Sequence, residues 1–549
     1  MALIAGACGS SDNDNAGSKS TTTDDVKVPK GGTLVIGAEQ EPDCMDWIGT
    51  CSGSSWGYWM VTVNTMPRAF DILKSADGDY SYKHNSLLTA EPKLETSPVQ
   101  TVTYDINPKA VWNDGTPITS TDFKYTWDQI ANGADVYDKT GYDLIEKVDD
   151  TDKATAVVTF KSGQNYSDWK GLFTGNYGIF PSHLLQGKDR DAEMKDGYKF
   201  SGGPWILEAW NKTDNITLVP NPNFWGTKPN LDKVIFKVQA DTSAEFTAFK
   251  SGQVSAIYPQ PQLDAVDQIN AGLPGTKKDI NAKTGNFEAL WLNNAVAPFD
   301  DLAVRKAVAY AVDRAAIVQR LFGALGVKAP LNDLNATVVS QFTDPQAFAK
   351  YKLDLGMVDK TLTGAGWAKG SDGVYAKGGQ KLAFKVRTTA GNKRRETTQQ
   401  ILQTQFKAAG MEMSVDNLKA GDLFGKALPT GDFQAAIYAN VLTTLGPSTC
   451  NLFCTKNSND IGQSGGNNYT RTRIPALDEQ LLKMDGELDD DALVTEGKAA
   501  SNISAENMIS LPIDPLPTIL LWNSKVVGPI ADNALLGPWW NLNTWGVTS

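Results

Sequence analysis

The chain has 549 residues, which is too many for one hydrophobic core, so we expect roughly two to four domains. Its composition, 41% hydrophobic and 21% charged, is ordinary for a soluble globular protein. A net charge of -12 argues against a nucleic-acid partner, which would require a basic surface. No segment has the run of about 18 apolar residues that a transmembrane helix needs.

The first residues of the chain indicate a surface lipoprotein. Leu3 to Ser11 reads L-I-A-G-A-C-G-S-S and resembles a bacterial lipobox, in which small residues precede a cysteine that receives acyl chains. We therefore expect Cys8 to be lipidated and the protein to lie on the outer face of the cell membrane, held by a lipid anchor alone. Gly9 to Asp25 is rich in Ser, Thr, Asp, Asn and Gly, so residues 1–30 are interpreted as a lipobox and a disordered tether.

The remaining four cysteines form two pairs that are close in sequence. Cys44 and Cys51 can close one small loop, and Cys450 and Cys454 can close another. A zinc site is the competing interpretation. However, neither pair has C-x-x-C spacing, and the only two histidines lie far from both pairs. Two disulfides are therefore predicted, and no metal site, in agreement with an oxidising compartment.

Strands and helices alternate along the first half of the chain, which is typical of an α/β fold. Thr33–Gly37 is predicted to be a buried strand, and the loop after it, Glu39 to Gly57, carries Trp56. In α/β sheets, ligand contacts usually lie in loops that follow the carboxyl ends of strands. Further strands are predicted at 99–105, 154–160, 205–210, 216–219 and 234–238, and helices near 120–130 and 243–251.

The stretch 286–323 is interpreted as a crossing between two globular bodies. Phe287–Asn293 alternates as a strand does. A helix is then expected, with Asp300 or Asp301 as its cap and Gly323 as a left-handed stop. An ordinary strand–helix unit within one large domain would give the same pattern, so periodicity leaves both interpretations open.

The side chains of this expected helix divide into two faces. Apolar residues recur at three-to-four spacing from Leu302 to Ile317, and they leave Arg305 and Arg314 mostly on the other side. Beyond this helix the predicted elements are strands at 382–388, 411–415 and 433–440, and helices at 396–409 and 474–484.

Four blocks resemble the extracellular solute-binding proteins of family 5, the receptors of oligopeptide, dipeptide and nickel ABC importers. In the family's order they are V-W-N-D-G-T-P-I-T-S-T-D-F at 111–123, G-G-P-W-I-L-E-A-W with N-P-N-F-W at 202–225, L-N-N-A-V-A-P-F-D-D-L-A-V-R-K-A-V-A-Y-A-V-D-R at 292–314, and A-G-W with D-G-V at 365–374.

The resemblance implies an α/β clamshell of two lobes, with an extra subdomain on lobe I. It also implies that solute is captured without catalysis or cofactor and delivered to a membrane permease, with a monomeric receptor. A peptide is the leading ligand class; a metal chelate, a sugar or another amphiphile are the alternatives.

The family's layout also implies the domain boundaries. Lobe I would be discontinuous and comprise 31–70, 180–283 and 501–549. Its subdomain would fill 71–179, and lobe II would run over 284–500. The second crossing is expected at Ile503–Pro512, ahead of a returning strand at Leu516–Trp522.

The resemblance places the ligand between the lobes. In peptide-binding members an aspartate after a lobe II strand holds the peptide's ammonium group, and the matching position here is Asn440. An amide brings no charge, so either another acid such as Glu39 takes this role or the ligand is not an ordinary peptide. The full set of candidate ligand contacts is Glu39, Trp56, Trp59, Trp291, Tyr438, Asn440, Asn468, Tyr469 and Trp522.

A secreted serine hydrolase is the distant alternative. Gly53-Ser54-Ser55-Trp56-Gly57 matches the G-x-S-x-G pattern of a nucleophile elbow, with His183 as the candidate downstream histidine. An elbow requires a strand that leads directly into the serine, whereas a Cys- and Gly-rich loop precedes Ser55. We therefore expect Ser55 to be a loop residue and the protein not to be an enzyme.

Overall fold

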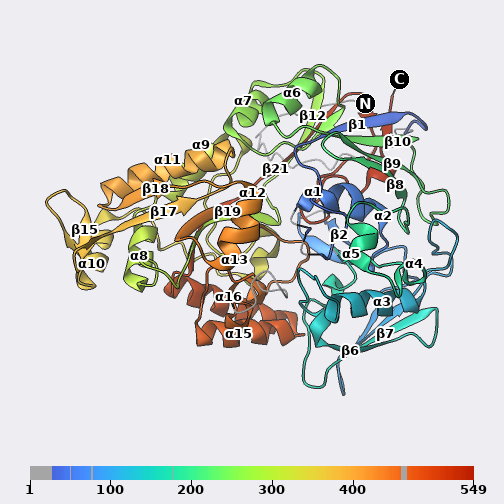
Figure 1. The fold of residues 1–549 in the computed structure, drawn as a ribbon, viewed down its shortest axis with the longest axis horizontal. Coiled ribbons are helices and arrows are strands. Elements are labelled where there is room, and N and C mark those ends of the chain that lie inside the picture. Colours follow the sequence, from blue (N-terminus) through green and yellow to red (C-terminus); the bar gives the residue numbers. More distant parts are fainter. Residues whose placement is uncertain are drawn as a thin grey trace, which may run out of the picture.

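The computed structural model describes residues 28–49, 51–52, 54–75, 78–175, 177–458 and 467–548. Two α/β bodies lie side by side along the long axis of the molecule (Figure 1). The lipobox with Cys8, and nearly all of the expected tether, lie outside the described residues. Within the described ranges, no helix is both long and apolar enough to cross a bilayer.

Lobe I is built on a seven-stranded mixed sheet. Leu34 and Ile36 of its central strand β1 are fully buried, as their alternation predicts. Strand β21, from the C-terminal part of the chain, lies between β11 and β12, so distant parts of the sequence complete this sheet. In spatial order the strands are β12 (Thr276–Asn281), β21 (Thr518–Asn523), β11 (Ala256–Ile257), β1 (Thr33–Ala38), β10 (Lys233–Val238), β9 (Asn215–Pro220) and β8 (Trp205–Asn211).

Lobe II is built on a five-stranded sheet. All seven residues of its strand β13 are buried, because β13 has a strand on each side and is covered on both faces. In spatial order the strands are β18 (Glu412–Val415), β17 (Ala383–Arg387), β19 (Ala435–Val441), β13 (Asn286–Leu292) and β20 (Ser510–Pro515).

Strand β20 corrects the expected position of the second crossing. Residues 501–515 were assigned to lobe I from the sequence, but Ser510–Pro515 pairs with β13 in the sheet of lobe II. The chain therefore crosses between Pro515 and Thr518, not at Ile503–Pro512. Prolines lack a backbone N–H, and β20 tolerates two of them because it lies at the edge of its sheet.

A separate four-stranded antiparallel sheet lies beside lobe I and forms the subdomain. Helix α3 (Ser120–Ala131) packs on it and begins with a capping box between Thr119 and Asp122. The strands of this sheet, in order, are β4 (Lys93–Glu95), β5 (Thr101–Asp105), β7 (Thr155–Phe160) and β6 (Ile145–Asp149). Small sheets are formed by β2 (Phe70–Lys74) with β3 (Tyr80–His84), by β14 (Ala368–Lys369), β15 (Tyr375–Lys377) and β16 (Gln380–Lys381), and by β22 (Val526–Val527) with β23 (Gly546–Val547).

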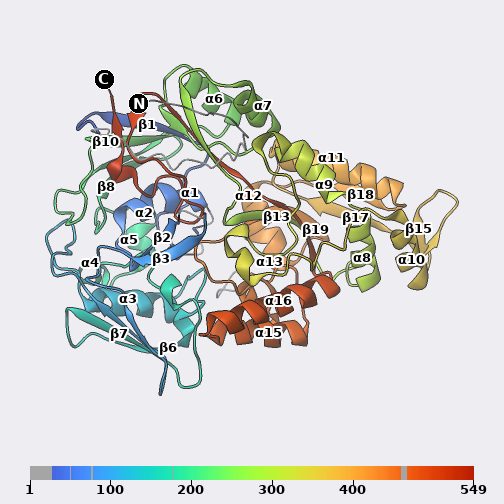
Figure 2. The same ribbon diagram turned by 180° about the vertical axis from the view of Figure 1, so that it is seen from behind.

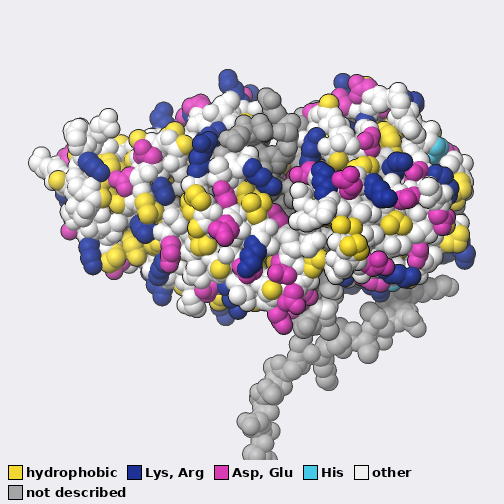
Figure 3. All heavy atoms as spheres, turned by 90° about the horizontal axis from the view of Figure 1, so that it is seen from below, with side chains coloured by type: hydrophobic (Ala, Val, Ile, Leu, Met, Phe, Trp, Pro, Cys, Tyr) yellow, Lys and Arg dark blue, Asp and Glu magenta, His cyan; other side chains and the backbone are white. Residues whose placement is uncertain are grey.

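Helices cover the sheets of both lobes (Figures 1 and 2). Lobe I and its subdomain also carry α1 (Ser55–Gly57), the π-helical turn η1 (Tyr58–Thr62), α2 (Val63–Thr65), α4 (Ser182–Leu185), α5 (Arg190–Met194), α6 (Thr242–Lys250) and α7 (Leu263–Ala271). Lobe II carries α8 (Leu302–Tyr310), α9 (Arg314–Phe322), α10 (Leu355–Gly364), α11 (Lys393–Ala408), α12 (Ala420–Asp422), the π-helical turn η6 (Leu423–Ala427), α13 (Leu428–Thr430), α14 (Cys450–Phe453), α15 (Pro475–Gly486) and α16 (Asp490–Glu506). On the face seen in Figure 3, acidic and basic side chains are interspersed over both bodies.

The helix expected after β13 is in fact two helices. Asp301 caps α8, as predicted, by accepting a hydrogen bond from the N–H of Ala303 (2.9 Å). The chain then turns, and Asp313 caps α9. Gly323 does not end the helix in a left-handed conformation, because its φ is -55° and a short 3-10 turn follows. The left-handed residue is Gly326, with φ +85°.

Two arginines of this region are buried, contrary to the expectation that they face away from the core. Arg314 is 4% exposed and donates to the carbonyls of Leu331, Pro512, Phe348 and Tyr351. Arg305 similarly donates to the carbonyls of Phe299, Asn507 and Met508. Each guanidinium satisfies several loop carbonyls, which helical periodicity cannot reveal.

A buried ionic cluster joins β13 to the start of α11. The Glu288 carboxylate accepts hydrogen bonds from Arg394 (3.0 Å) and Arg395 (2.6 Å). Burial by itself favours the neutral acid, but the charges of the two arginines lower the pKa of Glu288 to about 2. Asp514 of β20 lies opposite Glu288, and burial together with the Glu288 charge raises the pKa of Asp514 to about 8.

Candidate functional site between the lobes

The two lobes contact each other through hydrogen bonds at several places. At one of them, the Asn392 amide of lobe II donates to Gln260 of lobe I (3.2 Å). At another, the N–H of Leu445 donates to the Tyr82 hydroxyl (2.8 Å). Lobe II also forms hydrogen bonds with the subdomain. The Asn451 amide of lobe II donates to the Asp138 carboxylate (2.9 Å), and the Ser167 N–H of the subdomain donates to the Asp485 carbonyl of lobe II (2.6 Å). The structure is therefore of the molecule with its lobes closed together.

Three buried aromatic rings, Trp56, Trp59 and Tyr258, pack together on lobe I. The ring of Trp59 lies 5.7 Å from that of Tyr258 in an edge-to-face arrangement, and Trp56 lies 6.0 Å from Trp59. The helix that carries Trp56, α1, faces α12 of lobe II in both ribbon views (Figures 1 and 2). The sequence predicted Trp56 and Trp59 here; Tyr258 was missed, although it directly follows strand β11.

Glu39 follows β1 but does not point into open space. It is 4% exposed, and its carboxylate accepts hydrogen bonds from the Thr242 hydroxyl (2.5 Å) and the N–H of Gln260 (3.0 Å). Burial raises the pKa of Glu39 to about 7. Glu39 therefore supports Gln260, which meets Asn392 across the lobes, and in this closed arrangement its carboxylate is bonded within lobe I.

The lobe II side is centred on Tyr438 of β19. Trp291 stacks under Tyr438 (4.9 Å between centroids, 14° between planes), and its indole N–H donates to the Tyr438 carbonyl (2.8 Å). Trp291 is 1% exposed and its described ring neighbours all belong to lobe II, so in this closed arrangement it supports Tyr438 from beneath. Tyr469 and Phe424 pack edge-to-face on the other sides of Tyr438, at 6.5 and 5.7 Å.

Asn440 lies two residues beyond Tyr438 on the same strand and therefore on the same face of the sheet. Its side chain is half-buried, opposite Phe287 of β13. Within the described part of the chain, no hydrogen bond holds this amide. The Asn440 amide is therefore partly accessible, and its role as a ligand contact stays a prediction.

Two other candidates lie elsewhere. Asn468 is fully buried, and its amide donates to the carbonyls of Phe453, Cys454 and Thr472, so it fixes the conformation of this loop. Trp522 is partly buried in β21, opposite Lys277, and the described ring contacts do not include it.

Several polar residues at the lobe contact were not found from the sequence. Asp168 of the subdomain accepts a hydrogen bond from Tyr82 (2.7 Å), and burial raises the pKa of Asp168 to about 6. Burial likewise raises the pKa of Asp485, on lobe II, to about 6. The neighbours of each carboxyl come from distant parts of the sequence, as Tyr82 does for Asp168. A local sequence motif therefore cannot reveal these contacts.

Both predicted disulfides are present. Cys44 and Cys51 close the loop that precedes α1, and Cys450 joins Cys454 across α14. Phe453, inside the second loop, packs near Trp291 (6.2 Å). The two covalent loops thus lie next to the aromatic groups on either side of the lobe contact.

The described residues offer a weak case for a metal site. Carboxylate oxygens of Asp46, Asp135 and Asp191 lie within 4.8 Å of one another. However, the Arg190 guanidinium already donates to both oxygens of Asp46 (3.0 and 2.9 Å). A cation would have to replace this buried ion pair, so the residues do not fit a metal centre.

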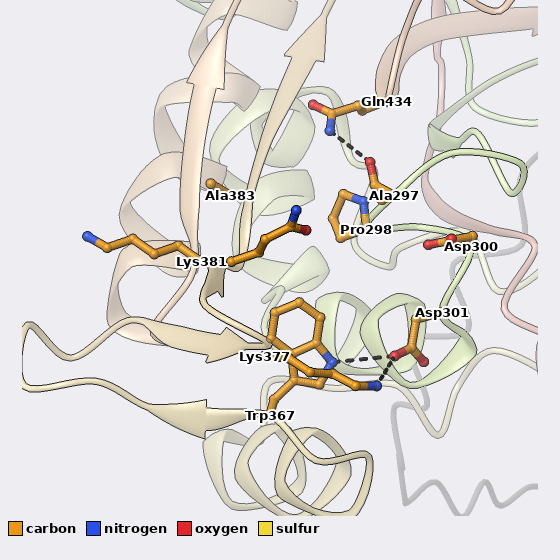
Figure 4. Close-up of a pocket in the computed structure, with 10 residues that line it drawn as sticks. Ala297, Pro298, Asp300, Asp301, Trp367, Lys377, Lys381, Ala383 and Gln434 are labelled. Carbon is orange, nitrogen blue, oxygen red and sulfur yellow. Dashed lines mark hydrogen bonds and ion pairs between the residues drawn. The ribbon is translucent and has the colours of Figure 1, made fainter.

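A pocket of about 450 Å³ opens on the outer part of lobe II (Figure 4). There Asp301, the cap of α8, contacts both the Trp367 indole N–H (3.4 Å) and Lys377 (3.5 Å). All the lining residues belong to lobe II, so closure of the lobes cannot enclose a ligand in this pocket. They are Ala297, Pro298, Asp300, Asp301, Trp367, Lys377, Gln380, Lys381, Ala383 and Gln434.

The local structure does not support a nucleophile elbow. Ser55 is the first residue of α1 and follows an irregular loop, whereas an elbow has a strand before the serine. His183 lies on α4, and its Nε2 pairs with Asp114 (2.9 Å). Ser55 is therefore a loop-to-helix residue, as expected.

Comparison with known proteins identifies the family. The family described as bacterial extracellular solute-binding proteins, family 5 (middle part), matches residues 87–460, well over half of the chain. Protein XP55 of Streptomyces lividans is 26% identical over 452 residues, which cover 82% of this chain and 77% of that protein. The oligopeptide-binding protein OppA of Mycobacterium tuberculosis is 26% identical over 437 residues, covering 77% and 70%.

The fold agrees with this assignment. The periplasmic EDTA-binding protein EppA superposes with a TM-score of 0.82 at 23% identity, covering 95% of this chain and 97% of that one. The predicted α/β clamshell is thereby confirmed, and the family is one of binding proteins. The chain therefore belongs to the bacterial extracellular solute-binding proteins of family 5.

Proposed function

We propose that the protein is the receptor of an ABC importer and captures a peptide between its two lobes. One observation supports this proposal: the lobes close against each other beside the exposed Phe424 ring and the half-buried Asn440 amide, which has no hydrogen-bond partner among the described residues. Ligand sites of this kind combine large apolar contacts with a few placed polar groups. The relative OppA is an oligopeptide-binding protein, which favours a peptide over other solutes.

Capture would work by closure of the lobes. The chain crosses between them at Lys283–Asn286 and again at Leu516, where the Leu516 N–H donates to the Asn286 carbonyl (3.0 Å). Hinged lobes exchange between open and closed forms, and a ligand that contacts both lobes stabilises the closed form. The Asn392–Gln260 and Leu445–Tyr82 hydrogen bonds would form only when the lobes close, and they stabilise the closed form. The permease would then recognise the closed shape and receive the solute.

The identity of the solute is tested by recovering it. Protein purified under native conditions is denatured, and the released small molecules are identified by mass spectrometry. A set of peptides is the expected result. Recovery of a metal chelate or a sugar in their place would contradict the peptide assignment while leaving a receptor. Turnover of an ester substrate that is lost in Ser55→Ala would contradict a receptor altogether.

We also propose that Cys8 carries the lipid anchor and that the protein is a monomer on the outer face of the membrane. The lipobox-like sequence around Cys8 supports the anchor. Expression of the full chain with its native leader in a bacterial host, followed by detergent partitioning, is expected to place it in the detergent phase. Cys8→Ser should move it to the aqueous phase, and equal partitioning of both would contradict the anchor.

A further inference from the structure

The two most exposed aromatic side chains in the described part of the molecule lie at the lobe contact. Phe424 is 38% exposed and Tyr137 is 44% exposed, whereas the other exposed large hydrophobic side chains are aliphatic. Phe424, on η6, packs edge-to-face on Tyr438 (5.7 Å, 82°). Tyr469 packs on Tyr438 from another direction (6.5 Å, 76°). Exposed rings that gather at one place indicate a contact surface.

Tyr137 belongs to the subdomain but lies close to the lobe II rings described above. Burial by the surrounding protein raises the pKa of its phenol well above the usual value, with a further contribution from Tyr469. The Tyr137 side chain is 44% exposed, so its ring remains accessible at this place. The Tyr137 hydroxyl also forms a hydrogen bond with Asn467 of lobe II.

Both disulfide loops hold Tyr137 in position. The N–H of Tyr137 donates to the carbonyl of Ile48, inside the Cys44–Cys51 loop (2.8 Å). Its neighbour Asp138 accepts from Asn451, inside the Cys450–Cys454 loop (2.9 Å). Rings fixed in advance lose little conformational entropy when a ligand binds, so this arrangement favours binding.

Two charged groups near these rings, Asp138 and Arg471, already have partners. The Asp138 carboxylate accepts from Asn451 and contacts the Thr140 hydroxyl. The Arg471 guanidinium donates to the carbonyls of Tyr469 (2.7 Å) and Pro429 (2.7 Å). A charged ligand group placed against the rings would lose its hydration without gaining an ion pair, whereas an apolar group would gain contact area.

We infer that these rings form a subsite for an aromatic or large aliphatic side chain of a bound peptide. The inference rests on the proposed function and names the ligand chemistry that this part of the cleft selects. The subsite is continuous with the contact between the lobes, so closure would enclose the side chain. Its members, called the ring subsite below, are Tyr137, Phe424, Tyr438 and Tyr469.

The test is a positional scan by isothermal titration calorimetry. Pentaalanine is compared with five peptides in which one position is Phe, and the best position is then repeated with Leu and with Lys. Burial of one large apolar side chain corresponds to roughly 10-fold tighter binding or more. We expect one position at which Phe and Leu reach this gain and Lys does not.

Variants then assign the selectivity to the ring subsite. Phe424→Ala is expected to reduce the preference for Phe over Ala to less than about 3-fold, because it removes one exposed wall of the site. Tyr137→Ala provides a second, independent variant of an exposed residue. Leu482→Ala, on α15 and 47% exposed, is the matched control and should leave the preference unchanged.

The outcomes separate the subsite from the function on which it rests. Equal binding of all the peptides by the unmodified protein overturns the ring subsite and leaves the peptide receptor intact. A Phe preference that persists in both Phe424→Ala and Tyr137→Ala also overturns it. No binding of any peptide overturns the proposed peptide function, and the ring subsite with it.

Discussion

Replacing Asn440 with aspartate tests whether this position receives the ammonium group of a peptide. Asn440 is half-buried on β19, and its amide has no hydrogen-bond partner within the described part of the chain. Asn440→Asp changes the acceptor from a neutral amide to a carboxylate of nearly the same shape. The one nearby acid on the neighbouring strand, Glu288, is neutralised by Arg394 and Arg395, so it adds little repulsion.

The size of the effect follows from the charge of the new acceptor. A neutral hydrogen bond contributes about 1 kcal/mol, and one with a charged partner contributes about 1.5–3 kcal/mol. The variant should therefore gain roughly 0.5–2 kcal/mol, which is about 2- to 30-fold tighter binding of a peptide with a free amino terminus. The same peptide with an acetylated amino terminus has no ammonium group and should gain nothing.

Calorimetric titration of the two peptides against both proteins measures this difference. Asn132→Asp, at the exposed C-terminal end of α3, adds the same charge away from the lobe contact and serves as the control. Equal gains for the free and acetylated peptides would show that the carboxylate acts through general electrostatics. Unchanged affinity for both would refute the assignment of Asn440 to the amine site.

Three further predictions concern stability and pH. Glu288→Gln should lower the free energy of unfolding of lobe II by up to about 3–5 kcal/mol in chemical denaturation, because it removes the carboxylate that pairs with the buried Arg394 and Arg395, and Asp514 replaces that charge only in part. Ligand affinity should fall as pH rises from about 4 to about 6. Burial raises the pKa of Asp168 to about 6 in the closed form, and separated lobes would expose it to water, so closure takes up a proton below that pH. Asp168→Asn should make the affinity profile shallower between about pH 4 and 6, and Asp485, whose pKa is also raised to about 6, accounts for the remaining slope. Asn468→Ala should cost about 1–3 kcal/mol of stability in the same denaturation assay, because buried carbonyls lose their donor.

Each of these predictions has a result that would contradict it. For Glu288→Gln the control is Glu396→Gln on α11, the helix that carries Arg394 and Arg395. Its partner Lys393 is exposed, so this change should cost less than about 1 kcal/mol. An equal cost for the two variants would disprove the special role of the buried cluster. An unchanged or reversed pH profile in Asp168→Asn would rule out that carboxyl as the source. If Asn468→Ala loses affinity but not stability, Asn468 contacts ligand after all.

The elements of this protein follow from local sequence patterns. Alternation in Thr33–Gly37 predicts β1, and Thr119 with Asp122 predicts the start of α3, because both patterns act over a few residues. The pairing of Cys44 with Cys51 was also predictable, since neighbours in sequence need little loop closure to meet.

Which candidate site residues are buried, and which groups they contact, could be learned only from the tertiary structure. Trp291, Glu39 and Asn468 have the residue types of a ligand site, but the fold buries each of them in a supporting role. Gln260 and Asn392 carry no local signal and meet only because the lobes close.

The sequence by itself determined the family, the order of strands and helices, the two disulfides and the presence of aromatic residues near the cleft. The tertiary structure alone decided where the chain crosses back at Leu516, which rings remain accessible, and which polar groups pair across the lobes. The physical reason is one of range: backbone propensities, caps and short loops act within about one turn or hairpin, whereas burial and ion pairing depend on residues that folding brings together from distant parts of the chain.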